Sequence, residues 1–235
     1  MFKGIIKLII IFIIGLCGGI FANQILWPYL VEKPLYQEYQ LASLPVLAET
    51  KEITIEENTA LEDAVERIEK SIVGIKTIIK DKEIFGSGIV VTSDGLIVTL
   101  NELVPKSGDF VFYVDGKKPN WQILKRDVKN NLVLIKLEEN DLKTIAFADF
   151  DNIRLGQRAF LLGMIFNESN SLLVNEGMIK YFTREYIRTN IYEKATLSGS
   201  ALFNIKGELL GLNTIDAEER VTAIPITKIR EFIGY

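Results

Sequence analysis

The sequence contains no histidine and a single cysteine, Cys17, among its 235 residues. Histidine is the residue whose side chain changes charge near neutral pH, so its absence excludes Ser-His-Asp catalysis and histidine-ligated metal sites. One cysteine forms no intrachain disulfide, so the fold depends on packing alone. We expect no metal and no cofactor, and any chemistry has to use carboxylates, lysine, tyrosine, serine or backbone groups.

A surplus of positive charge is also absent. The formal net charge is −4, from 27 basic and 31 acidic residues, which argues against nucleic acid as a partner. Hydrophobic residues make up 48% of the chain and charged residues 25%. This balance supplies a sizeable core and argues against wholesale disorder.

One long apolar run stands at the N-terminus. Leu8 to Ala22 carries no charge, and Gly4 to Ile6 extends it, because Lys7 can direct its ammonium group toward lipid headgroups. Lys3 and Lys7 precede the run, which by the positive-inside rule places the N-terminus in the cytoplasm and the rest of the chain outside. We therefore predict a single transmembrane anchor over residues 1–27.

The residues after this run are consistent with an anchor. Trp27 and Tyr29 fall where membrane proteins carry an aromatic belt. A cleaved signal peptide has a similar layout and is the alternative, although Ile20-Phe21-Ala22 puts a bulky residue where cleavage needs a small one. Residues 28–58 are rich in proline and acidic residues and predict an extracytoplasmic tether, with a reach of about 100 Å when fully extended.

Residues 59–235 predict one all-β domain. Thr59-Ala-Leu-Glu62 is a capping-box pattern that predicts the start of a short helix, and Ile226 to Ile233 predicts a closing helix. Between them, short runs of isoleucine, valine and leucine alternate with turn signals, which indicates a sandwich or barrel. We expect strands over residues 72–79, 88–91, 96–100, 110–114, 121–124, 132–137, 158–164, 172–181, 187–192, 200–203, 208–214 and 221–224.

The segment from Phe85 to Asn101, FGSGIVVTSDGLIVTLN, resembles the stretch that leads to the catalytic histidine of HtrA/DegP-type serine proteases. The resemblance implies a trypsin-like double antiparallel β-barrel, with an active site between the barrels. The PDZ domain common in that family is expected to be absent, so any peptide recognition would lie on the barrels. Further segments resemble the family in the same order: residues 64–77, 127–136, 154–180, 187–214 and 223–225.

The family's catalytic positions fall on residues of the wrong chemistry. Its histidine position falls on Glu102, its aspartate position on Asn131 and its serine position on Ser198. The resemblance assigns the oxyanion hole to the backbone amides of Thr196 and Ser198, where Thr196 replaces a glycine. If this alignment holds, Glu102 and Asn131 lie in the first barrel and face Ser198 across the cleft, within roughly 10 Å of one another.

Each change damages acyl transfer. An exposed glutamate has a pKa near 4.3, which makes it a weak base toward a serine hydroxyl. Asn131 supplies no negative charge to steady a developing cation, and in a serine–histidine–aspartate triad the same aspartate-to-asparagine change costs about 10⁴ in turnover. A β-branched threonine resists the backbone freedom that glycine gives an oxyanion loop.

Plainer interpretations of these residues stay open. Ser198 can be a loop serine without a chemical role, Glu102 a solvated carboxylate at a strand end, and Asn131 a turn cap. Lys194 lies near Ser198 in the sequence and is the alternative base of a serine–lysine dyad.

Three functions follow. The first is a non-catalytic protease homologue outside the membrane, which binds extended peptides, unfolded proteins or an envelope protein partner by strand addition. The second is a serine endopeptidase that uses Ser198 with an unusual base, Glu102 or a lysine. The third is a structural subunit that forms homo-oligomers or joins an active relative through the anchor and tether.

Overall fold

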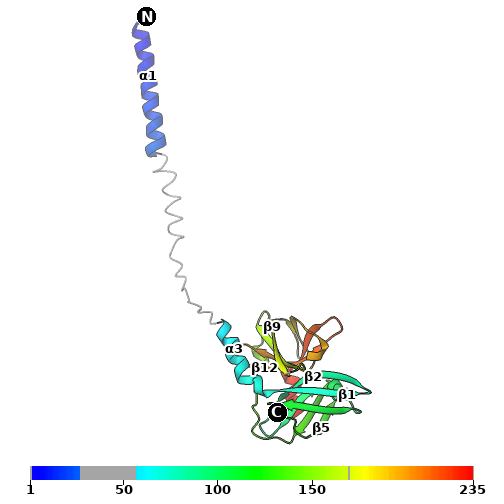
Figure 1. The fold of residues 1–235 in the computed structure, drawn as a ribbon. Helices are drawn as coiled ribbons and strands as arrows, with labels where there is room; N and C mark the ends of the chain where they lie inside the picture. The colour runs from blue at the N-terminus through cyan, green and yellow to red at the C-terminus, as the bar shows by residue number, and fades with distance from the viewer. Residues whose placement is uncertain (1, 27–56, 169, 235) are drawn as a thin grey trace. The chain divides into compact units, whose positions relative to one another are not determined.

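The computed structural model describes residues 2–26, 57–168 and 170–234 (Figure 1). The chain divides into two compact units, Met1–Thr54 and Ile55–Tyr235. In the first unit, α1 (Phe2–Phe21) continues into a short π-helical segment, η1 (Ala22–Leu26). Residues Lys3–Ile25 are long and apolar enough to cross a membrane, and none of them is buried. A membrane anchor and a signal sequence both meet this criterion. The predicted aromatic belt, Trp27 and Tyr29, and residues 28–56 of the predicted tether lie outside the described residues.

The second unit begins with a helix, as predicted, but the helix starts earlier than the capping box indicates. Helix α3 spans Glu57–Ile68 and is followed by a 3-10 turn, η3 (Glu69–Ser71). Thr59 is therefore a helical residue and not the N-cap.

The first sheet is antiparallel, with the strand order β4-β1-β2-β3-β6-β5. Strands β1 and β2 form a hairpin through Lys80 and Asp81, which both have positive φ (46° and 63°). Consecutive residues in this left-handed conformation match the right-handed twist of the two strands. The bounds are β1 (Ile72–Ile79), β2 (Lys82–Val90), β3 (Leu96–Leu100), β4 (Asp109–Val114), β5 (Trp121–Asp127) and β6 (Leu132–Leu137).

The second sheet has the order β11-β8-β9-β10-β13-β12-β7, and an additional pairing of β11 with β12 closes it into a barrel. All its pairs are antiparallel except the two-residue contact between β12 and β7. The bounds are β7 (Ala146–Phe147), β8 (Arg158–Ile165), β9 (Ser171–Phe182), β10 (Ile187–Tyr192), β11 (Ala201–Asn204), β12 (Glu208–Ile215) and β13 (Arg220–Pro225). The predicted all-β, trypsin-like double-barrel fold is confirmed.

The larger of two hydrophobic core clusters spans both barrels, and the smaller one lies within the second barrel. The larger core cluster joins Ile75 of β1 to Phe160 of β8 and Phe203 of β11. The rings of Phe160 and Phe203 stack with centroids 5.5 Å apart. Figure 1 shows the cyan-to-green first sheet beside the yellow-to-red second sheet. Helix α4 (Ile226–Ile233) closes the chain as predicted and packs Ile229 and Phe232 into this core.

Candidate functional site

Ser198 lies in a tight loop between the two barrels. It follows a 3-10 turn, η6 (Ala195–Leu197), and only 5% of its surface is exposed. Its carbonyl oxygen accepts a hydrogen bond from the Ser87 amide of β2, at 2.9 Å. A residue of the second barrel is thereby tied to a strand of the first. The loop that carries the serine is held by the backbone as well as by its side chains.

The residues after Ser198 complete this loop. Gly199 has φ of +76°, a conformation that suits glycine, and a Cβ there would overlap the carbonyl oxygen of Ser87. The Gly199 amide donates to the Asn213 carbonyl at 2.8 Å, and the Asn213 amide donates to the Ser200 carbonyl at 2.8 Å. Inside the barrel, Asn213 Nδ2 also donates to Ser200 Oγ, at 3.0 Å. These bonds join the C-terminal end of the loop to β12.

One of the two predicted oxyanion donors, the Ser198 amide, is already used within the turn. The Ser198 amide donates to the Ala195 carbonyl at 3.0 Å, and the Leu197 amide donates to the Lys194 carbonyl at 2.9 Å. An oxyanion hole needs amides that point at the substrate oxygen with their hydrogens unshared. The Ser198 amide therefore reaches a substrate oxygen only after the 3-10 turn opens. Thr196, at the centre of the turn, is exposed.

Glu102 and Asn131 come together in the first barrel. Glu102 lies in a 3-10 turn, η4 (Asn101–Leu103), and its backbone amide donates to Asn131 Oδ1 at 3.0 Å. The carbonyl oxygen of Asn131 accepts from the Asn101 amide, also at 3.0 Å. Asn131 thus holds η4 with both its backbone and its side chain, in a left-handed conformation with φ of 55°. The Glu102 side chain itself is exposed.

The turn that presents Asn131 is stabilised by Asp127. Its carboxylate accepts hydrogen bonds from the side-chain amide and the backbone amide of Asn130, at 2.6 Å and 3.0 Å. These bonds favour the ionised form and lower the pKa of Asp127 below its usual value. Arg126, from the same strand end, donates to Asn101 Oδ1 at 2.8 Å. A hydrogen-bond network therefore positions both candidate residues of the first barrel.

Leu103 links this network to the serine loop. It directly follows Glu102, is only 3% exposed, and packs against Gly86 and Gly199. Its Cδ1 atom lies 2.8 Å from the place that a Cβ on Gly199 would take. The turn with Glu102 therefore contacts the loop with Ser198. That the side chains of Glu102, Asn131 and Ser198 lie within roughly 10 Å of one another stays a prediction.

Sequence reasoning does not single out Ser87, Leu103 or Asn213 as parts of this site. Ser87 is visible in the sequence only as the middle residue of Gly86-Ser-Gly88, and Leu103 and Asn213 look like ordinary strand residues. Lys194, the alternative base, is exposed at the start of the serine loop. Among the described residues, no group of three or more acidic or cysteine side chains is arranged to hold a metal.

Comparison with known proteins identifies the class. The sequence pattern of the trypsin-like peptidase domain matches residues 86–212, more than half of the chain, and the protein belongs to this family. The matched stretch contains Glu102, Asn131, Thr196 and Ser198. The double barrel and the loop around Ser198 are the corresponding structural features.

Individual relatives are of the HtrA/DegP type. The chain is 26% identical over 144 residues to a probable periplasmic serine endoprotease DegP-like of Pseudomonas fulva, covering 57% of this chain and 30% of that protein. It is 30% identical over 194 residues to the serine protease HTRA1A of Danio rerio, covering 73% of this chain and 40% of that protein. The chain thus spans about a third of the length of such relatives, and their names support the HtrA type within the family.

Solved structures agree on the fold. The HtrA-type protease AlgW with tripeptide matches with a TM-score of 0.66 and 22% identity, over 74% of this chain and 62% of that one. The crystal structure of Deg5 matches with a TM-score of 0.67 and 21% identity, over 77% of this chain and 95% of that one. At these identities the likeness establishes the double-barrel fold and nothing about activity.

Proposed function

We propose that this protein is a catalytically inactive member of the trypsin-like peptidase family, which holds extended peptide segments of unfolded or partner proteins outside the cytoplasm. The observation that carries the proposal is the hydrogen bond from the Ser198 amide to the Ala195 carbonyl. It occupies one of the two amides that the resemblance assigns to the oxyanion hole, in a chain without histidine.

The chemistry on the first barrel supports the same conclusion. A serine hydroxyl needs a base that removes its proton and then returns it to the leaving amine. The histidine position carries the solvent-exposed Glu102, and its neighbour Asn131 presents an amide whose oxygen is occupied by the Glu102 backbone. Neither residue supplies an imidazole or the carboxylate that orients one. Proton transfer therefore lacks a base, and one of the two oxyanion donors is occupied.

Peptide binding needs only backbone groups, and β12 offers them. The amide and carbonyl of Asn213 point toward the serine loop, where they bond Ser200 and Gly199. Because strand residues alternate, the amide and carbonyl of Ile215 point to the same side, beyond the end of β11. An extended peptide can add there as a further strand, which is a common mode of peptide recognition.

We expect the purified full chain to show no casein hydrolysis above background and no labelling of Ser198 by a fluorophosphonate probe. Fluorescein-labelled casein should nevertheless bind, and Ser198→Ala should leave its Kd unchanged, because no bond to the serine hydroxyl is needed. Anisotropy titration and gel fluorescence measure the two properties. Turnover that disappears in Ser198→Ala would instead establish an enzyme with an unusual base.

Ile215→Pro tests, in the same titration, whether a peptide adds as a strand to β12 at Ile215. Proline removes the amide that faces the peptide but leaves the bonds of Thr214 to β13 in place. We expect casein binding to weaken about tenfold, the effect of one to two lost hydrogen bonds. Ile215→Val is the matched control and should bind as the parent does. Equal binding by all three proteins would rule out this edge.

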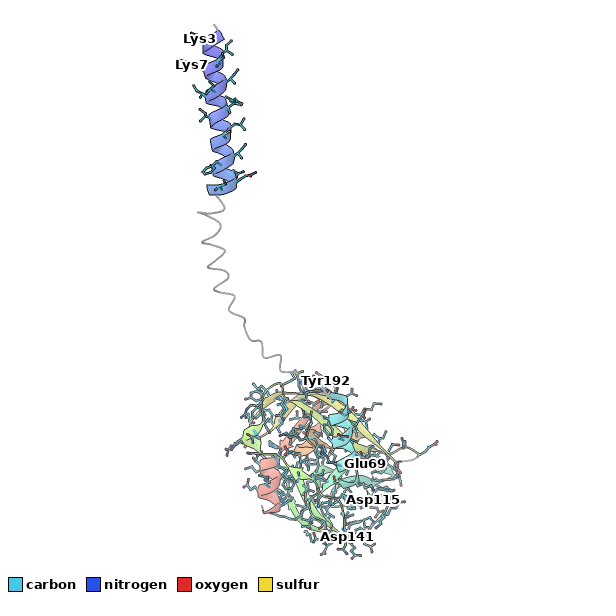
Figure 2. All side chains as sticks on the ribbon, turned by 90° about the vertical axis from the view of Figure 1, so that its left-hand side faces the viewer. Lys3, Lys7, Glu69, Asp115, Asp141 and Tyr192 are labelled. Atoms are coloured by element: carbon cyan, nitrogen blue, oxygen red, sulfur yellow. The ribbon has the colours of Figure 1, made fainter. Side chains whose placement is uncertain are left out.

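We also propose that the barrels lie outside the cytoplasm, with α1 as an uncleaved anchor. Lys3 and Lys7 lie at the N-terminal end of α1, and Figure 2 marks both. Protease added to spheroplasts should therefore digest the barrel domain, and the mature protein should retain residues 1–27 by mass spectrometry. Full protection contradicts the orientation, and a mature N-terminus beyond residue 22 contradicts the anchor.

A further inference from the structure

A second candidate site lies in the second barrel, apart from the serine loop. A pocket of about 450 Å³ is formed by β9, β10, β13 and the end of the β12 strand. Its charged and aromatic lining residues are Lys180, Tyr181, Arg188, Tyr192, Asp216 and Arg220. None of the four candidate residues of the serine site lines it. The pocket is therefore a separate feature of the fold.

An irregularity in the sheet lies at the pocket. On β10, Arg188 pairs with Thr222, and the next paired residue is Tyr192, opposite Arg220. Between these pairs, three residues of β10 (Thr189 to Ile191) lie opposite one residue of β13 (Val221), and none of the three has a register partner on β13. The Thr189 hydroxyl fills part of the gap by donating to the Val221 carbonyl at 3.2 Å. Bulges of this kind redirect side chains and are common beside binding sites.

The pocket carries positive charge that the protein does not neutralise. Among the described residues, Lys180 and Arg188 are exposed and neither forms an ion pair. Arg220 is neutralised by Asp216, at 2.8 Å, and by Glu218, at 2.9 Å. The Arg188 guanidinium lies 5.1 Å from the centre of the Tyr186 ring, which orients it without cancelling its charge. Within the described part of the chain, this pocket thus keeps two cations available to an anionic ligand.

Exposed apolar side chains lie on the same two strands as these cations. Within residues 57–234, four of the nine exposed large hydrophobic residues lie on β9 and β10. They are Val174, Met178, Tyr181 and Tyr192, which are 39%, 46%, 49% and 60% exposed. Figure 2 shows Tyr192 at the rim of the folded unit. Tyrosine, methionine and arginine together are the composition typical of protein-binding surfaces.

We propose that this pocket binds an acidic, apolar peptide segment of a partner protein. Its carboxylate would lie between Lys180 and Arg188, because a guanidinium binds a carboxylate through two parallel hydrogen bonds. A neighbouring apolar side chain would pack against Tyr181 and Tyr192. The charge of the pocket selects the acidic partner, and its tyrosines select an apolar neighbour. The pocket would bind this segment whether or not the serine site holds a peptide.

The test uses the full chain in detergent and a short fluorescein-labelled peptide in which glutamate alternates with leucine. We expect the double variant Lys180→Glu/Arg188→Glu to weaken binding at least about tenfold, since it replaces both attractions by repulsions. The matched control, Lys106→Glu/Lys143→Glu, makes the same change in net charge at exposed lysines elsewhere and should bind as the parent does. Binding by the parent should also weaken as salt rises.

Three outcomes overturn the proposal. The first is that a lysine–leucine peptide binds as tightly as the glutamate–leucine peptide, and the second is that the control variant loses as much peptide affinity as the double variant. The third is that the peptide binds only when the protein self-associates in sedimentation. Ile215→Pro should weaken casein binding more than binding of the acidic peptide, because it removes an amide of β12 and neither of the two cations of the pocket. Arg188→Lys keeps the positive charge but removes the paired hydrogen bonds of the guanidinium. It should weaken peptide binding less than Arg188→Glu does. Thermal unfolding of each variant, unchanged from the parent, shows that the fold is intact.

Discussion

A variant that combines Glu102→His, Asn131→Asp and Thr196→Gly should cleave casein about 10²- to 10³-fold faster than the double variant Glu102→His/Asn131→Asp. That factor is the cost of one missing oxyanion donor. In the present chain the Ser198 amide bonds Ala195 within the turn that holds Thr196. Glycine at position 196 gives the turn the backbone freedom to open. Initial rates of casein hydrolysis measure the difference.

The first barrel is suited to receive the two catalytic side chains. Asn131 Oδ1 already accepts the amide of residue 102, and a carboxylate at position 131 keeps this acceptor while adding the negative charge. Ser198→Ala in the triple variant is the control and should abolish the activity. Equal rates for the double and triple variants would mean that the turn at Thr196 does not limit catalysis.

Replacing Gly199 by alanine should lower the free energy of unfolding by roughly 2–5 kcal/mol, the sum of a left-handed conformation and an overpacked site. The added Cβ overlaps the Ser87 carbonyl oxygen and comes within 2.8 Å of Leu103 Cδ1. Neither neighbour has room to move, because Ser87 belongs to a central strand and Leu103 is buried. Urea unfolding followed by tryptophan fluorescence measures the loss.

Gly116→Ala is the matched control for this experiment. Gly116 has nearly the same φ, +74° against +76°, but no atom lies within 4 Å of an added Cβ. Gly116→Ala should lower the free energy of unfolding only through the left-handed conformation, by about 1 kcal/mol. If both substitutions destabilise the protein equally, the contact between the serine loop and β2 contributes nothing.

The regular elements can be predicted because their residues repeat with a clear period. The sequence predicts elements over residues 72–79, 96–100, 132–137, 187–192 and 226–233 with the bounds that the structure has. Strand β7 is not predicted, because its two residues, Ala146 and Phe147, are too few to show a hydrophobic period. Residues 82–87, the first six of the nine residues of β2, are not predicted, because Lys80 and Asp81 form the hairpin turn without the usual glycine or asparagine.

The site is only partly predictable. Motif order assigns Glu102, Asn131, Thr196 and Ser198, but residue types do not specify where a backbone amide points. The bond from Ser198 to Ala195 depends on how η6 folds, and the bond from Glu102 to Asn131 joins residues 29 positions apart. The pocket lined by Lys180 and Arg188 cannot be predicted from the sequence for a similar reason. It depends on a break in strand register that no local pattern records.

Ser87 connects more of the molecule than its size suggests. Its amide bonds Ser198, its carbonyl oxygen accepts from Thr99 Oγ1 at 2.6 Å, and its hydroxyl accepts from the Met164 amide at 2.9 Å. Three segments from both barrels thus meet at one fully buried residue. We therefore expect the two barrels to open together as one cooperative unit. A chain without histidine therefore still needs the Gly86-Ser-Gly88 motif, because folding requires these residues independently of any catalysis.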